Sequence, residues 1–249
     1  MNTLATSTFF AAYSGSDLFG KMIFLGLILL SIVSWIFIIY QVWIVRLLDP
    51  LAKKYAHLFQ NSNDQLLTKP IESLPALPMR DLQNPFIQIF LSFKNKTGQL
   101  LEKNLYFAKQ TGEKTPRVYL SEKDIDLLES HALITLNDQI KQLEKNLYIL
   151  STIAPLAPFL GLLGTVWGIL QTFSGMQSGL AITSNNAVLA GLATALTTTV
   201  LGLLIAIPAL VGNNYLRSRF RALSSDMEGF LYNLLSTLEL QYRKVDLPT

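Results

Sequence analysis

Four threonine hydroxyls lie close together in a stretch of the chain that is otherwise almost entirely apolar. They are Thr194, Thr197, Thr198 and Thr199, which fall within six residues. One or two such side chains can bond back to carbonyls of their own helix. Four of them indicate a polar lining, because hydroxyls can hold water or the ligand shell of an ion without the cost of a fixed charge in hydrocarbon.

Small and hydroxyl-bearing residues recur at helical spacing on two segments. In the first, Gly161, Thr165, Gly168 and Thr172 follow one another at steps of 4, 3 and 4, which places them on one helical face. Close helix packing is the alternative explanation, and it accounts well for the glycines and alanines. Both interpretations stay open on the pattern alone. The second face consists of Ala187, Gly191, Thr194, Thr198, Gly202, Ala206 and Ala209.

Enzymatic chemistry finds no support in the residue types. The chain has no cysteine, and its two histidines, His57 and His131, lie in separate polar stretches where nothing completes a metal coordination set. No phosphate-binding glycine loop with its lysine and no nucleophile with a nearby base is present. No charged residue and no histidine occurs from Asn146 to Leu216. A proton relay in this stretch would therefore need a titratable group from a partner helix.

Three apolar spans predict an all-α integral membrane protein. Residues 22–45 contain no charge and would form a helix of about 36 Å, longer than a hydrocarbon core of about 30 Å. This run is too long for a signal peptide and ends in Arg46 rather than at a small-residue cleavage site. The uncharged stretch that follows residue 145 is long enough for two crossings. A segment rich in Gly, Ser and Asn at 174–186 divides it into spans at 149–173 and 187–211.

The distribution of basic residues predicts the orientation of these spans. Of 20 Lys and Arg residues, 14 lie between Arg46 and Lys145, 5 follow Leu216, and Lys21 alone precedes the first span. The positive-inside rule therefore places residues 46–148 and 212–249 in the cytoplasm, and residues 1–21 and 174–186 on the periplasmic side. The formal net charge is +3 with no basic cluster, so nucleic acid is not expected as a partner.

The cytoplasmic part is expected to be helical, with long extensions of the spans. Ser121 followed by Asp124 resembles a helix N-cap, and apolar residues then recur at steps of 3 and 4, so one helix is predicted to run from there into the second span. The same spacing continues after the third span, and we expect the two extensions to pack on each other. An irregular connector is predicted around Pro70, Pro75, Pro78 and Pro85.

The second and third spans resemble the signature of the TolQ/ExbB/MotA proton channel family. Residues 157–169 read APFLGLLGTVWGI and match the second-span motif; residues 191–209 resemble the motif that follows. Three spans with an external N-terminus fit the TolQ/ExbB branch rather than four-span MotA. The residues that carry this resemblance are Pro158, Gly161, Gly164, Trp167, Gly168, Gly191, Gly202 and Pro208.

The resemblance implies a subunit of a motor in the bacterial inner membrane. It implies a homopentamer around a dimer of a TolR/ExbD-type single-span protein, which in turn acts on a periplasm-spanning protein of TonB/TolA type. The partner's membrane aspartate would meet Thr165 and Thr199, and no cofactor is implied. Many relatives have a glutamate where this chain has Thr194, so the transported ion is expected to be H⁺ with Na⁺ as the alternative. A structural or permease-type subunit without ion flux is the competing hypothesis.

Overall fold

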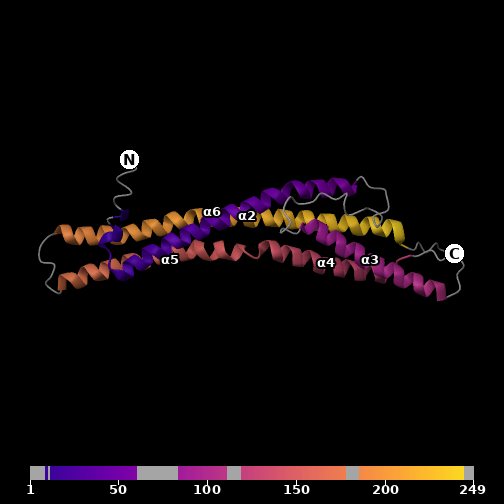
Figure 1. The fold of residues 1–249 in the computed structure, drawn as a ribbon, viewed down its shortest axis with the longest axis horizontal. Coiled ribbons are helices and arrows are strands. Elements are labelled where there is room, and N and C mark those ends of the chain that lie inside the picture. Colours follow the sequence, from indigo (N-terminus) through magenta and orange to yellow (C-terminus); the bar gives the residue numbers. More distant parts are fainter. Residues whose placement is uncertain (1–8, 11, 61–83, 111–118, 178–184, 244–249) are drawn as a thin grey trace. The chain divides into compact units, whose positions relative to one another are not determined.

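The computed structural model describes residues 9–10, 12–60, 84–110, 119–177 and 185–243, and nearly all of them are helical. The helices are α2 (Leu18–Gln60), α3 (Pro85–Gln110), α4 (Glu122–Glu144), α5 (Leu147–Gln177) and α6 (Asn185–Tyr242) (Figure 1). Within the described ranges there is no strand; one isolated bridge joins Leu120 and Arg243. The prediction of an all-α fold is confirmed.

The chain divides into two compact units. Unit 1 consists of Met1–Val42 and Asn146–Arg217, and unit 2 of Trp43–Lys145 and Ser218–Thr249. Helices α2 and α6 each contribute a segment to both units. Three helical stretches are long and apolar enough to cross a membrane, which confirms the predicted number of spans: Leu18–Ala52, Glu122–Gln177 and Gly191–Tyr242.

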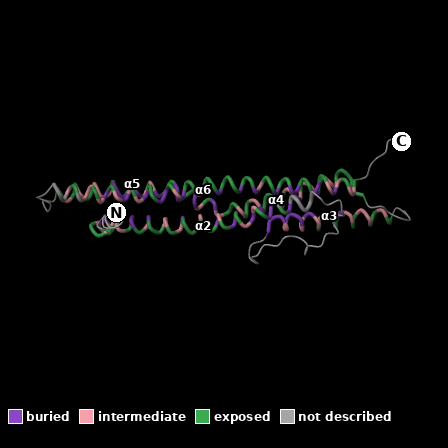
Figure 2. The backbone as a smooth tube through the Cα atoms, turned by 90° about the horizontal axis from the view of Figure 1, so that it is seen from above, coloured by how far each residue is buried: buried purple, intermediate pink, exposed green. Residues whose placement is uncertain are grey.

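Unit 1 is built from the first part of α2, from α5 and from the first part of α6. Helix α5 and the first part of α6 run alongside each other in Figure 1 and overlap in the view turned by 90° (Figure 2), and glycines of each helix contact the other. Its apolar core is made largely of small side chains from α5 and α6 together with two larger ones from α2. The core residues are Ile23, Leu27, Ile153, Ala154, Ala157, Ile205, Ala206 and Ala209.

Unit 2 has a core of large side chains. The rings of Tyr55 and Phe86 stack at 5.2 Å, and Phe230 meets both of them edge-on at 5.6–5.7 Å. Asn84 donates a hydrogen bond to the Tyr55 hydroxyl at 3.2 Å. Burial raises the pKa of Tyr55 to about 12 although this hydrogen bond opposes the shift. Tyr55 is therefore a neutral core residue at any physiological pH.

The start of α4 agrees with the capping signal in the sequence, whereas the boundary between α4 and α5 was not predicted. Ser121 is the N-cap of α4, and its hydroxyl and the Asp124 carboxylate form a capping box, as predicted. The predicted helix from there into the second span is present as one helical stretch, Glu122–Gln177, but it is interrupted, because α4 ends at Glu144 and α5 begins at Leu147. Asn146 competes for backbone hydrogen bonds and is a weak helix former, which fits a break at this point.

The two helical segments that extend the second and third spans, α4 and the last part of α6, share one apolar core, as expected. Leu128 and Leu136 of α4 belong to the same buried cluster as Met227 and Leu234 of α6. Pro85 is the first residue of α3, where its missing N–H costs no helical hydrogen bond. The predicted connector at Pro70, Pro75 and Pro78 and most of the 174–186 turn lie outside the described residues.

Candidate functional site

Helices α5 and α6 approach so closely that glycine is required at several contacts. A Cβ on Gly202 would lie 2.6 Å from the Ala157 carbonyl oxygen, and one on Gly161 would lie 2.9 Å from the Thr198 carbonyl oxygen. Both neighbours are backbone atoms, which cannot move without shifting a helix. A Cβ on Gly164 would lie 2.5 Å from the Thr198 hydroxyl oxygen. These residues form the α5–α6 seam, in which small residues allow the two backbones to pack together.

Two other motif glycines continue this seam toward the end of α5 and the start of α6. A Cβ on Gly168 would lie 2.7 Å from the Ala195 Cβ, and one on Gly191 would lie 2.5 Å from the Thr172 hydroxyl oxygen. The motif prolines lie inside the helices, Pro158 in α5 and Pro208 in α6, and both are half-buried. The glycines of the motif therefore all lie at contacts between the two helices.

The Gly161 carbonyl oxygen of α5 accepts hydrogen bonds from two threonine hydroxyls of α6. Thr198 and Thr199 each place their hydroxyl 3.1 Å from the Gly161 carbonyl oxygen. Thr198 also lies 2.7 Å from the Ala195 carbonyl oxygen, so its one proton is shared between two acceptors. Thr165 is buried and donates to the Leu162 carbonyl of its own helix at 2.7 Å. The hydroxyls at the centre of unit 1 thus donate their protons to backbone oxygens and keep their lone pairs.

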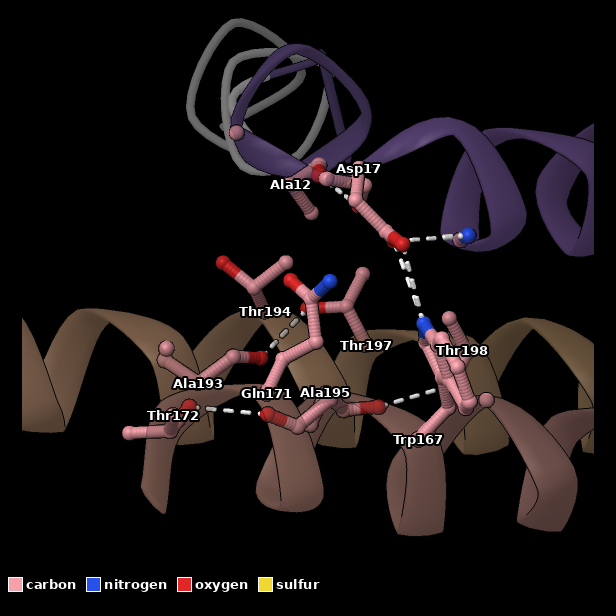
Figure 3. A pocket seen from close by; sticks show the side chains of 16 residues that line it. Ala12, Asp17, Trp167, Gln171, Thr172, Ala193, Thr194, Ala195, Thr197 and Thr198 are labelled. Atoms are coloured by element: carbon pink, nitrogen blue, oxygen red, sulfur yellow. Dashed lines mark hydrogen bonds between the residues drawn. The ribbon is translucent and has the colours of Figure 1, made fainter. Parts of the chain in front are cut away.

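A cavity of about 640 Å³ opens in unit 1 where α5 ends and α6 begins. Figure 3 shows Gln171, Thr194 and Thr197 pointing toward the segment that carries Ala12 and Asp17. The residues singled out from the sequence that line this cavity are Thr172, Thr194, Thr197, Thr198, Gly164, Trp167, Gly168 and Gly191. Thr165 and Thr199 are not among its lining residues. Thr194, Thr197 and Thr198 therefore lie at the cavity, whereas Thr165 and Thr199 lie in the part of the α5–α6 seam beyond it.

Asp17 borders the cavity directly before α2 and bonds to the second apolar span. Its carboxylate accepts the Gly20 N–H at 2.9 Å, which caps α2, and the Trp167 indole N–H at 3.1 and 3.2 Å to its two oxygens. Partial burial raises the pKa of Asp17, but the hydrogen bonds from Gly20 and Trp167 outweigh this effect and lower the pKa overall. Asp17 is therefore an ionised carboxylate at neutral pH.

Asp17 and Gln171 are site residues that the sequence patterns did not predict. The signal for Asp17 is an acidic residue immediately before an apolar span, and for Gln171 a polar amide inside one. No spacing rule connects Asp17 to Trp167, because the two are 150 residues apart. No group of three or more potential metal ligands occurs in the described ranges.

These features define a class of protein: a membrane-spanning helical subunit whose interior carries hydroxyls and, at one end, a carboxylate beside a cavity. A family model described as the MotA/TolQ/ExbB proton channel family matches residues 99–229. The chain belongs to this family, which confirms the resemblance found in its sequence. The family is one of channels rather than enzymes.

The relatives include proteins named TolQ and proteins named ExbB. The chain is 36% identical over 108 residues to the Tol-Pal system protein TolQ of Haemophilus influenzae, covering 43% of this chain and 47% of that protein. It is 44% identical over 88 residues to the biopolymer transport protein ExbB of Aquifex aeolicus, covering 35% and 59%. ExbB of Pseudomonas putida is 28% identical over 204 residues, covering 80% and 54%. The matches thus cover about half the length of these relatives.

Proposed function

We propose that this chain is the multi-span subunit of an ion-driven motor in the bacterial inner membrane, with its N-terminus outside and its C-terminus in the cytoplasm. Five copies would surround a dimer of a TolR/ExbD-type single-span protein. Ion flow through the complex would drive that partner, and through it a TonB/TolA-type protein, in envelope maintenance or outer-membrane transport. Membership of the proton channel family and its TolQ and ExbB relatives support the proposal.

The observation that carries the proposal is the hydroxyl cluster on the Gly161 carbonyl. Thr198 and Thr199 lie there in a stretch from Asn146 to Leu216 that has no ionisable acid or base other than tyrosine. Oxygen lone pairs in apolar surroundings suit a passing cation or a partner's carboxyl group. One charge that crosses 100 mV releases about 2.3 kcal/mol, so a few charges per cycle suffice for a conformational switch.

The ion is proposed to be H⁺, with Na⁺ as the rival. Thr194 cannot titrate near neutral pH, so protons would rely on a carboxyl group brought by the partner. The site needs no organic cofactor for this role. Comparing proton and sodium gradients in the same proteoliposomes identifies the ion.

A competing function is compatible with the glycine contacts and is tested in the same experiment. In that view the α5–α6 seam only packs helices, as in a structural or permease-type subunit, and the complex conducts no ions. The Gly161 and Gly202 distances agree with it as well as with a channel. Flux measurements separate the two hypotheses.

The experiment measures ion flux in proteoliposomes that contain this protein with its single-span partner. Thr199→Val removes a hydroxyl and keeps the shape, and a hydrogen bond to a charged group contributes about 1.5–3 kcal/mol, so flux should fall about tenfold or more. Thr199→Ser should restore it. The matched control is Thr152→Val, because Thr152 is exposed on α5 and donates to its own helix at 2.9 Å. Normal flux in Thr199→Val and Thr165→Val, both fully assembled, would contradict the pore assignment.

A further inference from the structure

The cavity beside Asp17 presents several oxygen acceptors, although the Gln171 amide and the Thr194 hydroxyl that line it can also donate. Ser16 donates its hydroxyl proton to the Ala12 carbonyl at 2.6 Å, Thr172 donates to Gly168 at 2.8 Å, and Thr197 donates to Ala193 at 2.8 Å. A hydroxyl has one proton, so these three can present only oxygen lone pairs to anything in the cavity. All three residues line it.

One fixed charge accompanies these oxygens. Asp17 is the only ionisable side chain among the described residues that line the cavity. The Trp167 N–H is aimed at the Asp17 carboxylate rather than into the open space (Figure 3). Phe19 packs against the Trp167 ring at 4.5 Å, which holds the start of α2 on α5. An anion would be repelled by the Asp17 carboxylate, whereas a cation would be attracted by this charge and could bind the oxygen lone pairs beside it.

We propose that Asp17 and the cavity it borders form a capture site for a small monovalent cation, H₃O⁺ or Na⁺, with Trp167 as the positioning residue. Asp17 lies outside residues 99–229, which match the family model. The proposal rests on the proposed function for its role at the outer mouth of an ion path, but cation binding itself does not depend on it. A cavity with one sign of charge and apolar walls raises the local counter-ion concentration by about 10- to 1000-fold.

The alternative is that Asp17 only caps α2 and ties it to Trp167. Asp17→Asn distinguishes the two, because asparagine is an equally good N-cap and its amide oxygen can accept the Trp167 N–H, while the charge is lost. A capping role predicts no change in this variant. A capture role predicts a loss of cation occupancy with the fold intact.

The first measurement uses Trp167 itself as the reporter. In the full-length protein carrying Trp35→Phe and Trp43→Phe, Trp167 is the single tryptophan, and Cs⁺ quenches indole fluorescence on contact. Asp17→Asn should lower the Cs⁺ quenching constant about tenfold at low ionic strength, and leave quenching by neutral acrylamide unchanged. Asp126→Asn, which removes an exposed carboxylate from α4, is the control. Equal Cs⁺ quenching with and without Asp17 would overturn the proposal.

Flux in the assembled complex gives the second measurement. Asp17→Asn should raise the half-saturating cation concentration and leave the maximal flux unchanged, and the deficit should shrink as salt screens the charge. Trp167→Phe should give a smaller shift in the same direction and no further shift when combined with Asp17→Asn, because both act through one carboxylate. Additive shifts would contradict the positioning role.

The two proposals fail in different ways. If wild-type complexes conduct no ions but Cs⁺ quenching depends on Asp17, the motor function is wrong and the cation site remains. If flux is normal but neither half-saturation nor quenching depends on Asp17, the cation site is wrong and the motor function remains. Adding Na⁺ or lowering the pH during the Cs⁺ quenching measurement identifies which cation competes with Cs⁺ at Asp17.

Discussion

The two units of this protein use opposite kinds of side chain to hold helices together. Unit 1 packs Gly161 and Gly202 against backbone atoms, with Ala154 and Ala157 in the same core. Unit 2 instead fills its core with rings such as Phe86, which is fully buried. Between lipid-exposed helices burial of apolar surface gives little driving force, so close backbone approach and hydrogen bonds must replace it. Unit 2 should therefore be damaged by removing bulk, and unit 1 by adding it.

The largest effect is expected from truncating a ring in unit 2. Phe86→Ala should lower the free energy of unfolding by about 3–5 kcal/mol, because a buried ring leaves a cavity that the helices cannot fill. Denaturant unfolding of the full-length protein in detergent, followed by circular dichroism, measures it. Phe107→Ala on the same helix is the control, since Phe107 is 55% exposed and should change stability little. A cost below about 1 kcal/mol for Phe86→Ala would contradict the assigned core.

Adding one methyl group to unit 1 should have the next largest effect. Gly202→Ala places a Cβ against the Ala157 carbonyl and should cost about 1–3 kcal/mol, although alanine is the better helix former. Thermal denaturation in detergent micelles checks this. Gly26→Ala in α2 meets nothing within 4 Å and should not destabilise the protein. Equal stability of the two variants would show that the α5–α6 contact is looser than described.

A pH titration tests the charge of Asp17, the one ionisable residue among the described residues that line the unit 1 cavity. The pKa of Asp17 is lowered in the folded protein, so its charge and the stability it contributes are present above the ordinary carboxyl range and are lost only as pH falls through the lowered value. Cs⁺ quenching of Trp167 should therefore stay constant from about pH 7 to pH 5 and decline below the ordinary carboxyl pKa. A decline centred near about pH 6 would contradict this assignment.

The smallest expected effect is a gain in unit 2. Gly229 lies inside α6 with nothing within 4 Å of an added Cβ, unlike Gly202 on the same helix. Gly229→Ala should raise the free energy of unfolding by up to about 1 kcal/mol, because alanine loses less backbone entropy in a helix. The same unfolding experiment measures it. Destabilisation would indicate that this face of α6 packs against another subunit.

Much of the architecture could be predicted from local patterns. The 24-residue uncharged run, the long stretch without charge after residue 145 and the spacing of apolar residues define the spans and the helices. Capping at Ser121 and Asp124 was predictable because it depends on residues three positions apart. The break at residues 145–146 was not, since apolar spacing continues across it and only the weak helix former Asn146 marks it.

In the candidate site, too, the sequence predicts which helix faces are involved but not which contacts the side chains make. Small residues and threonines at steps of 3 and 4 identify the faces of α5 and α6, but they leave open which hydroxyl bonds across the seam. Thr199 bonds to Gly161 on the other helix, whereas Thr165 bonds within its own helix. The acceptor of each hydroxyl depends on how α5 and α6 are rotated and shifted relative to each other, and the sequence of either helix alone does not specify this.

By itself the sequence determined the membrane class, the three spans and the family, because hydrophobic length, charge distribution and a short motif are properties of contiguous residues. Only the tertiary structure decided that Asp17 meets Trp167 across 150 residues, and that Thr172 and Thr197 present lone pairs rather than protons to the cavity. The physical reason is that a hydrogen bond between distant segments requires the packed helices to bring donor and acceptor within about 3 Å.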